Sequence, residues 1–146
     1  MHDLPRQLSE EELAELFEGH TRVVERLAAL EDPLGQARKV LAEASEEEQV
    51  EALATHPRIG QRVGLSERAA REQGSDEDPA LLAALVRLNK SYESKFGFRF
   101  VVFVNGRPRA EILSVMRQRL RHSREEELAA GLDELVAIAL DRWRTR

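Results

Sequence analysis

The stretch FGFRFVVFVNG, residues 96 to 106, decides the fold class of the chain. Its phenylalanines and valines favour a β-strand, and the Asn-Gly pair at its end is typical of a hairpin turn. No other part of the chain is comparably rich in strand-favouring residues, so a strand here would have no partner. We therefore predict a buried irregular segment at residues 96–106. The predicted fold is all-α, a bundle of about six to eight helices in a single domain over residues 1–146.

The sequence on both sides of this segment carries helix signals. Three serine–glutamate pairs at capping-box spacing predict helix N-termini, and apolar residues at helical spacing follow each pair. The capping pairs are Ser9 with Glu12, Ser45 with Glu48 and Ser123 with Glu126. The predicted helices span residues 10–30, which Gly19 can interrupt, and then 36–44, 45–56, 66–73, 79–94, 109–121 and 123–143.

The composition excludes several classes of protein. Hydrophobic residues make up 42% of the 146 residues and charged residues 34%, and the formal net charge is -5. An acidic chain has little electrostatic support for binding nucleic acid. The absence of cysteine excludes disulfides, thiolate nucleophiles and cysteine-ligated metals. No stretch approaches the roughly 18 apolar residues of a membrane span, so we expect a cytoplasmic protein that binds no membrane.

His56 stands directly before a proline, in the run THPRIG. Pro57 disfavours the α conformation at the residue before it, so the helix should end at or just before His56. Two explanations of this histidine stay open. It can be a cationic cap that the dipole of the helix C-terminus favours, or an imidazole positioned for proton transfer.

Arg142 interrupts an apolar stripe. On a helical wheel it falls between Leu135 and Ile138, where a guanidinium must find an anion. That anion can be a structural partner or a substrate. Arg119 has a similar position on the preceding predicted helix, so the pattern alone does not choose between the two arginines.

Glu72 and Gln73 lie on the predicted helix 66–73, where a solvated face is the ordinary explanation of a charged residue. Combined with His56 and Arg142, Glu72 completes the parts of a small acid/base site for an anionic substrate. Arginine would hold a carboxylate, histidine would move a proton and glutamate would orient it. No two of the four histidines have the spacing of a helical metal motif, so we predict no metal.

Five motifs follow one another in a recognisable order. They are HPRIG, then EQ sixteen residues after the histidine, LN-x-x-Y-x-x-KFGF-x-FVV, an RL pair in a predicted helix, and EL-x-x-IA-x-x-R. Together they resemble the 2-oxo-4-hydroxy-4-carboxy-5-ureidoimidazoline (OHCU) decarboxylases of urate degradation. The resemblance covers about residues 50–143, and the N-terminal third matches poorly. It implies an all-helical enzyme that is generally a homodimer, uses no cofactor or metal, and binds a small anionic substrate.

The resemblance also implies roles for single residues. His56 and Glu72 match the catalytic histidine and glutamate, and Arg142, the anion anchor of the catalytic set, matches the substrate-binding arginine in preference to Arg119. Pro57 and Gln73 match substrate contacts. The stretch whose main chain contacts the substrate corresponds to Phe100, Val101, Val102, Phe103 and Val104.

The implied reaction converts OHCU to (S)-allantoin with loss of carbon dioxide. An imine carbon next to the carboxylated carbon accepts the electron pair, so the substrate carries its own electron sink. The chain departs from the family at Ala69, where a serine is frequent, at Arg58, where many members have an acidic residue, and in a shorter loop before Glu72. These departures leave two alternatives open: an inactive helical binding or assembly domain, and a decarboxylase of a related ureido or imidazole acid.

Overall fold

The computed structural model describes residues 7–59 and 78–145, and these residues form helices and no strand. The described helices are α1 (Glu10–Phe17), α2 (Arg22–Ala28), α3 (Pro33–Glu43), α4 (Glu46–Ala54), α6 (Pro79–Phe96), α7 (Arg109–Arg119) and α8 (Arg124–Arg144). The predicted all-α class is therefore confirmed. The predicted helix over residues 66–73 lies outside the described residues. None of the described helices is long and apolar enough to span a membrane.

Local sequence signals set the helix ends. All three predicted capping boxes form, at the N-termini of α1, α4 and α8. The long first helix predicted over residues 10–30 is divided into α1 and α2, and Thr21 caps the start of α2 by accepting from the Val24 amide. Gly19 lies in the break, where an added Cβ would stand 2.9 Å from Thr55 Cγ2. Glycine is needed there because the end of α1 approaches the end of α4 so closely.

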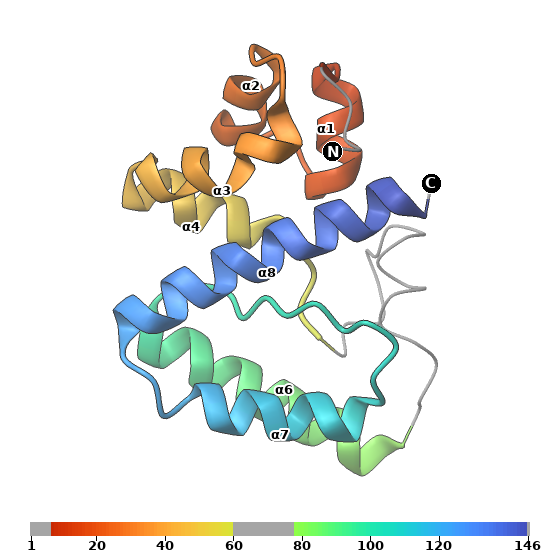
Figure 1. Ribbon diagram of the computed structural model, residues 1–146. Helices are drawn as coiled ribbons and strands as arrows, with labels where there is room; N and C mark the ends of the chain where they lie inside the picture. The colour runs from red at the N-terminus through yellow and green to blue at the C-terminus, as the bar shows by residue number, and fades with distance from the viewer. Residues whose placement is uncertain (1–6, 60–77, 146) are drawn as a thin grey trace.

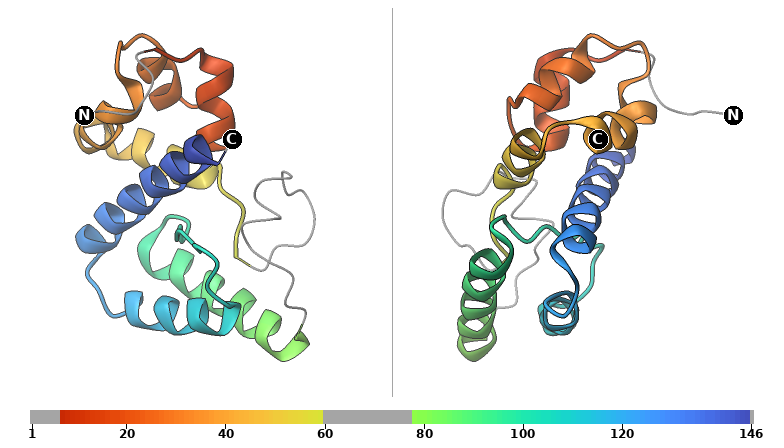
Figure 2. Two further views of the ribbon diagram at one scale, coloured as in Figure 1. Left: turned by 45° about the vertical axis from the view of Figure 1, so that its right-hand side comes forward. Right: turned by 90° about the vertical axis from the view of Figure 1, so that its left-hand side faces the viewer.

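Helix α8 is the central element of the arrangement (Figure 1). It contacts α1, α3 and α4, while α6 and α7 pack against each other on its other side. The irregular stretch 97–108 runs between α8 and the α6–α7 pair in Figure 1 and in the left view of Figure 2. This placement makes the stretch part of the core, because both of its sides are covered by helices.

The irregular segment is buried, as predicted, although Phe96 at its start is the last residue of α6. Side chains make hydrogen bonds to main-chain groups that a neighbouring strand would otherwise have paired. Arg119 Nη1 donates to the Val101 carbonyl at 2.8 Å, and Arg107 donates to the carbonyls of Phe103 at 2.6 Å and Val104 at 3.0 Å. A buried extended chain must satisfy its polar groups, and here arginines do so in place of a second strand.

A completely buried carboxylate, Glu127, supports Arg119 from α8. It accepts hydrogen bonds from Arg119 Nε at 2.8 Å and from the Tyr92 hydroxyl at 2.7 Å, and His122 Nδ1 lies 2.7 Å from its other oxygen. The Arg119 guanidinium also lies over the Phe100 ring, 4.5 Å from its centroid. Arg119 is therefore a structural arginine that joins α7, α8 and the irregular segment.

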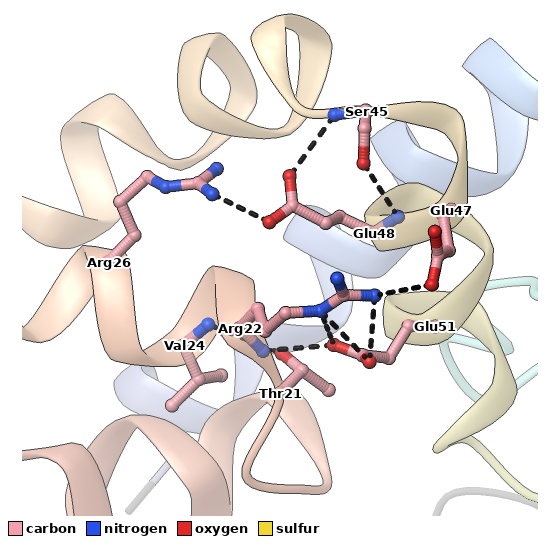
Figure 3. Close-up of polar contacts among 8 residues, drawn as sticks. All are labelled: Thr21, Arg22, Val24, Arg26, Ser45, Glu47, Glu48 and Glu51. Carbon is pink, nitrogen blue, oxygen red and sulfur yellow. Dashed lines mark hydrogen bonds and ion pairs between the residues drawn. The ribbon is translucent and has the colours of Figure 1, made fainter.

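Polar contacts join α2 to α4 at the surface (Figure 3). The main-chain amide of Arg22 donates to Glu51 at 2.9 Å, and its guanidinium contacts both Glu51 and Glu47. Arg26 Nη2 donates to Glu48 at 2.7 Å. Exposed pairs of this kind stabilise a fold only weakly. Here they link α2 to α4, the helix that leads into His56.

Candidate active site

His56 follows directly on the C-terminus of α4. The helix ends at Ala54 with Thr55 as its C-cap, two residues earlier than the predicted end at His56. Pro57 is the physical reason that the helix does not continue. The imidazole is buried, with the residue 5% exposed. The side chain of His56 therefore lies inside the protein and not at a solvent-exposed helix end.

Of the two explanations left open for His56, the structure does not support the cationic cap, because another residue has that role. Arg99 Nη1 donates to the carbonyl of Ala54 at 2.7 Å and to that of His56 at 2.8 Å. Burial, and then the positive charge of Arg142, lower the pKa of His56 from its ordinary value to about 4. The side chain is therefore neutral at neutral pH, and Arg99 supplies the positive charge at the end of α4.

The ring nitrogens of His56 have different environments. A hydrogen bond to the main chain of Phe17 raises the pKa, so its acceptor is the carbonyl. Nε2 is buried and has no hydrogen-bond partner among the described residues, which leaves Nδ1 as the donor. The neutral imidazole thus carries its proton on Nδ1 and a lone pair on Nε2. A buried, unpaired acceptor is suited to receive a proton from a bound molecule.

Arg142 is brought to the same region by the C-terminal half of α8. The residue is 2% exposed, and Nη1 donates to the Glu15 carbonyl at 2.9 Å and to Glu18 Oε2 at 2.6 Å. Its charge acts on the imidazole strongly enough to be the largest electrostatic contribution to the His56 pKa after burial. The structure therefore brings together two of the three predicted catalytic residues, one from the segment that follows α4 and one from α8.

Glu18 belongs to this region, and the sequence reasoning did not find it. It is one of 27 acidic residues and follows no apolar period, so no pattern distinguishes it. What distinguishes Glu18 is its backbone conformation, because it ends α1 in the left-handed region with φ 67° and ψ 20°. A carboxylate that contacts Arg142 and acts electrostatically on His56 is a site residue by position.

The remaining predicted site residues divide into two groups. Glu72 and Gln73, together with the departure at Ala69, lie outside the described residues, and their roles stay predictions. Pro57 is half-buried next to His56. Within residues 100–104 of the irregular segment, hydrogen bonds reach the main chain of three residues, and among the described residues none reaches Phe100 or Val102. Those three residues are Val101, Phe103 and Val104.

The described residues contain no group of three or more histidines, aspartates or glutamates arranged to hold a metal ion. The arrangement around His56 is chemically of another type. It combines a neutral imidazole, a buried guanidinium and a carboxylate, which can bind an anion and transfer a proton.

Comparison with known proteins shows that the family resemblance covers nearly the whole chain. The sequence model of the OHCU decarboxylase family matches residues 2–144. The chain belongs to the OHCU decarboxylase family. The match includes the N-terminal third, in which the motifs had shown a poor resemblance. That third holds Phe17 and Glu18, so both contacts of the site from α1 lie within the family region.

Relatives and a solved structure agree with this family membership. A 2-oxo-4-hydroxy-4-carboxy-5-ureidoimidazoline decarboxylase of Haloferax volcanii is 30% identical over 86% of this chain and 80% of its own length. One of Halalkalicoccus jeotgali is 34% identical over 74% of this chain and 64% of its own length. A crystal structure of OHCU decarboxylase in the presence of (S)-allantoin has a TM-score of 0.75 at 21% identity, over 90% of this chain and 94% of that one. At that identity the structural likeness shows a shared OHCU decarboxylase fold.

Proposed function

We propose that this protein is a cofactor-independent OHCU decarboxylase, a carboxy-lyase that forms (S)-allantoin in urate degradation. The observation that carries the proposal is a buried neutral imidazole on which the charge of a buried arginine acts, in a chain that matches the OHCU decarboxylase family over residues 2–144. Sequence patterns made both residues candidates, and the family resemblance assigned them to the site.

Arg142 is the proposed anchor of the anionic substrate, since a buried guanidinium binds a carboxylate by charge-assisted hydrogen bonds. The main chain of residues 100–104 is the proposed wall of the site. The absence of hydrogen bonds to Phe100 and Val102 within the described residues leaves polar groups there for a ligand. Pro57 and Gln73 are proposed substrate contacts, and Glu72 is the proposed orienting or proton-relay partner of His56.

The chemistry requires two proton movements around one bond cleavage. Carbon dioxide leaves, the electron pair of the broken bond flows into the neighbouring imine, and the imine nitrogen takes up one proton from solvent. The hydroxyl on the decarboxylated carbon loses its proton as it becomes a carbonyl. The lone pair on His56 Nε2 can accept that proton, and the imidazolium can deliver it to one face of the ureido-bearing carbon. Delivery from one fixed side produces a single enantiomer.

The test uses OHCU generated from urate immediately before the assay and follows optical activity by circular dichroism. We expect an excess of (S)-allantoin over the racemic product of spontaneous decay. The His56→Ala variant should lose turnover by about 10²-fold or more while keeping its helical spectrum. An inactive wild type would favour the binding or assembly alternative. Stronger thermal stabilisation by an unrelated acid than by allantoin-like anions would favour a different substrate.

We further propose that the protein is a cytoplasmic homodimer, as the family resemblance implies. Light scattering coupled to size-exclusion chromatography should then give twice the 16.6 kDa mass of one chain. A monomer mass at micromolar concentration would contradict the dimer. Fractionation of the source cells tests the compartment.

A further inference from the structure

Glu18 has a backbone conformation that costs energy for its residue type. Its φ of 67° lies in the left-handed region, which it shares with only one other non-glycine residue in the described part of the chain, Asn105. Asparagine tolerates this region well, whereas a longer side chain such as glutamate rarely adopts it. A glycine at position 18 would adopt this conformation without strain, but the glycine of this turn stands one position later, at Gly19. A strained residue that persists in a fold suggests that its side chain has a function.

The side chain of Glu18 is turned into the protein. It is 12% exposed, and its Oε2 accepts a hydrogen bond of 2.6 Å from Arg142 Nη1. The same nitrogen donates to the main-chain carbonyl of Glu15, one helical turn earlier. The end of α1 therefore holds one arm of the guanidinium at two points. A nearly fully buried arginine needs this kind of pairing to keep a defined orientation.

Glu18 also contributes to the charge balance around His56. Among the described residues, three charged groups face the imidazole: Glu18 from the end of α1, Arg142 from α8 and Arg99 from the irregular segment. The two arginines disfavour protonation of the imidazole, and Glu18 opposes them. The neighbouring carbonyl of Phe17 accepts the hydrogen bond from the same ring. Residues 17 and 18 thus contribute a hydrogen bond and a negative charge to the environment of the histidine.

We propose that Glu18 is a positioning residue of this site, which orients Arg142 for the anionic substrate and balances its charge next to His56. The inference rests on the proposed function, because it assigns Arg142 to the substrate. Without the carboxylate, the guanidinium would lose one of its fixed contacts, and the imidazolium that forms during turnover would face two arginines. Both substrate binding and the proton transfer should then suffer.

The experiment compares Glu18→Gln with Glu15→Gln. Glu18→Gln keeps the shape of the side chain and removes its charge. Glu15→Gln removes the same charge from an exposed side chain one turn earlier and keeps the main-chain carbonyl that contacts Arg142. We expect Glu18→Gln to lower kcat/KM about 10- to 100-fold, with a raised KM, and to shift the acid limb of the pH–rate profile to lower pH. Glu15→Gln should stay within roughly twofold of the wild type in kcat/KM.

A second measurement does not depend on activity. The imidazole ¹⁵N signals of His56 should titrate at lower pH in Glu18→Gln than in the wild type, and should be unchanged in Glu15→Gln. An unchanged His56 titration in Glu18→Gln overturns the proposal, as does kcat/KM within roughly twofold of the wild type. If the wild type itself does not decarboxylate OHCU, the proposed function fails, and the titration alone then decides the electrostatic role of Glu18.

Two further variants separate positioning from folding. Glu18→Gly relieves the backbone strain, so a residue that only terminated α1 would be replaced by glycine without loss of kcat/KM. We expect instead a loss at least as large as in Glu18→Gln. If Glu18→Gln does not fold, Glu18→Asp replaces it in the test. Aspartate keeps the negative charge but is one methylene shorter, so its carboxylate lies farther from Arg142. We expect a loss of about three- to tenfold in kcat/KM for Glu18→Asp, and wild-type activity in that case overturns the proposal.

Discussion

The approach of Gly19 to Thr55 defines a substitution whose cost follows from geometry. A Cβ on Gly19 would stand 2.9 Å from Thr55 Cγ2 and 3.2 Å from Thr55 Cβ. Thr55 is held in place, because its Oγ1 donates to the carbonyls of Ala52 at 2.9 Å and Phe17 at 3.2 Å. Gly19→Ala must therefore push the end of α1 away from the end of α4.

The change in the free energy of unfolding caused by Gly19→Ala is the balance of two effects. Overpacking at a fixed neighbour costs about 1–3 kcal/mol. The φ of Gly19 lies outside the left-handed region, so alanine can adopt it. Alanine also lowers the conformational entropy of the unfolded chain, and this effect offsets about 0.4–1 kcal/mol of the steric cost. We expect Gly19→Ala to lower the free energy of unfolding by about 1–2 kcal/mol. In a Thr55→Ser background the methyl group is absent and the hydroxyl remains, so the same substitution should cost about 1 kcal/mol less.

Urea unfolding of the wild type, the two single variants and the double variant measures this coupling. Gly131→Ala is a control, because its Cβ would meet Leu53 Cδ2 at 3.2 Å, at the far end of a flexible side chain. That variant should lose less stability than Gly19→Ala, since alanine is also favoured inside a helix. A coupling energy between positions 19 and 55 below about 0.5 kcal/mol would refute the steric argument.

Two other predictions concern buried polar groups. The folded pKa of His56, about 4, lies below its unfolded value of about 6.5, so the unfolded chain binds more protons between these pH values. Stability from this group is then complete above pH about 6.5 and falls by about 3 kcal/mol toward pH 4; urea titrations of His56→Gln should lack that pH dependence. Glu127→Ala leaves Arg119 buried without its carboxylate and should cost about 3–5 kcal/mol. Tyr92→Phe, which removes one donor to Glu127, should cost about 1 kcal/mol, and equal losses in urea unfolding would contradict this account.

The irregular segment shows why the fold class could be predicted. Its residues favour a strand, but a strand needs a partner, and the absence of a second strand-rich region was visible in the sequence. What the sequence did not reveal was how the main chain would be satisfied. Arg107 and Arg119 do so from positions that, in one dimension, look like ordinary cations in a chain with 22 of them.

The candidate site was only partly predictable. His56 and Arg142 could be singled out, because one precedes a proline that ends a helix and the other lies within an apolar stripe, and the family resemblance then assigned them to the site. Arg119 satisfied the same rule and proved structural, since a buried arginine can pair with a carboxylate of its own fold. Glu18 carries no such sequence anomaly, and its importance follows only from a backbone angle and a contact.

The sequence by itself determined the helix starts at the capping boxes and the stop before Pro57, because these depend on residues within one turn of each other. Tertiary structure alone decided the partner of Arg142, which lies 124 positions away at Glu18. It also decided the charge of His56. The dipole of the helix end by itself favours a protonated imidazole, whereas burial and the neighbouring arginine favour the neutral form. Desolvation depends on everything packed around a group, and no stretch of sequence contains that information.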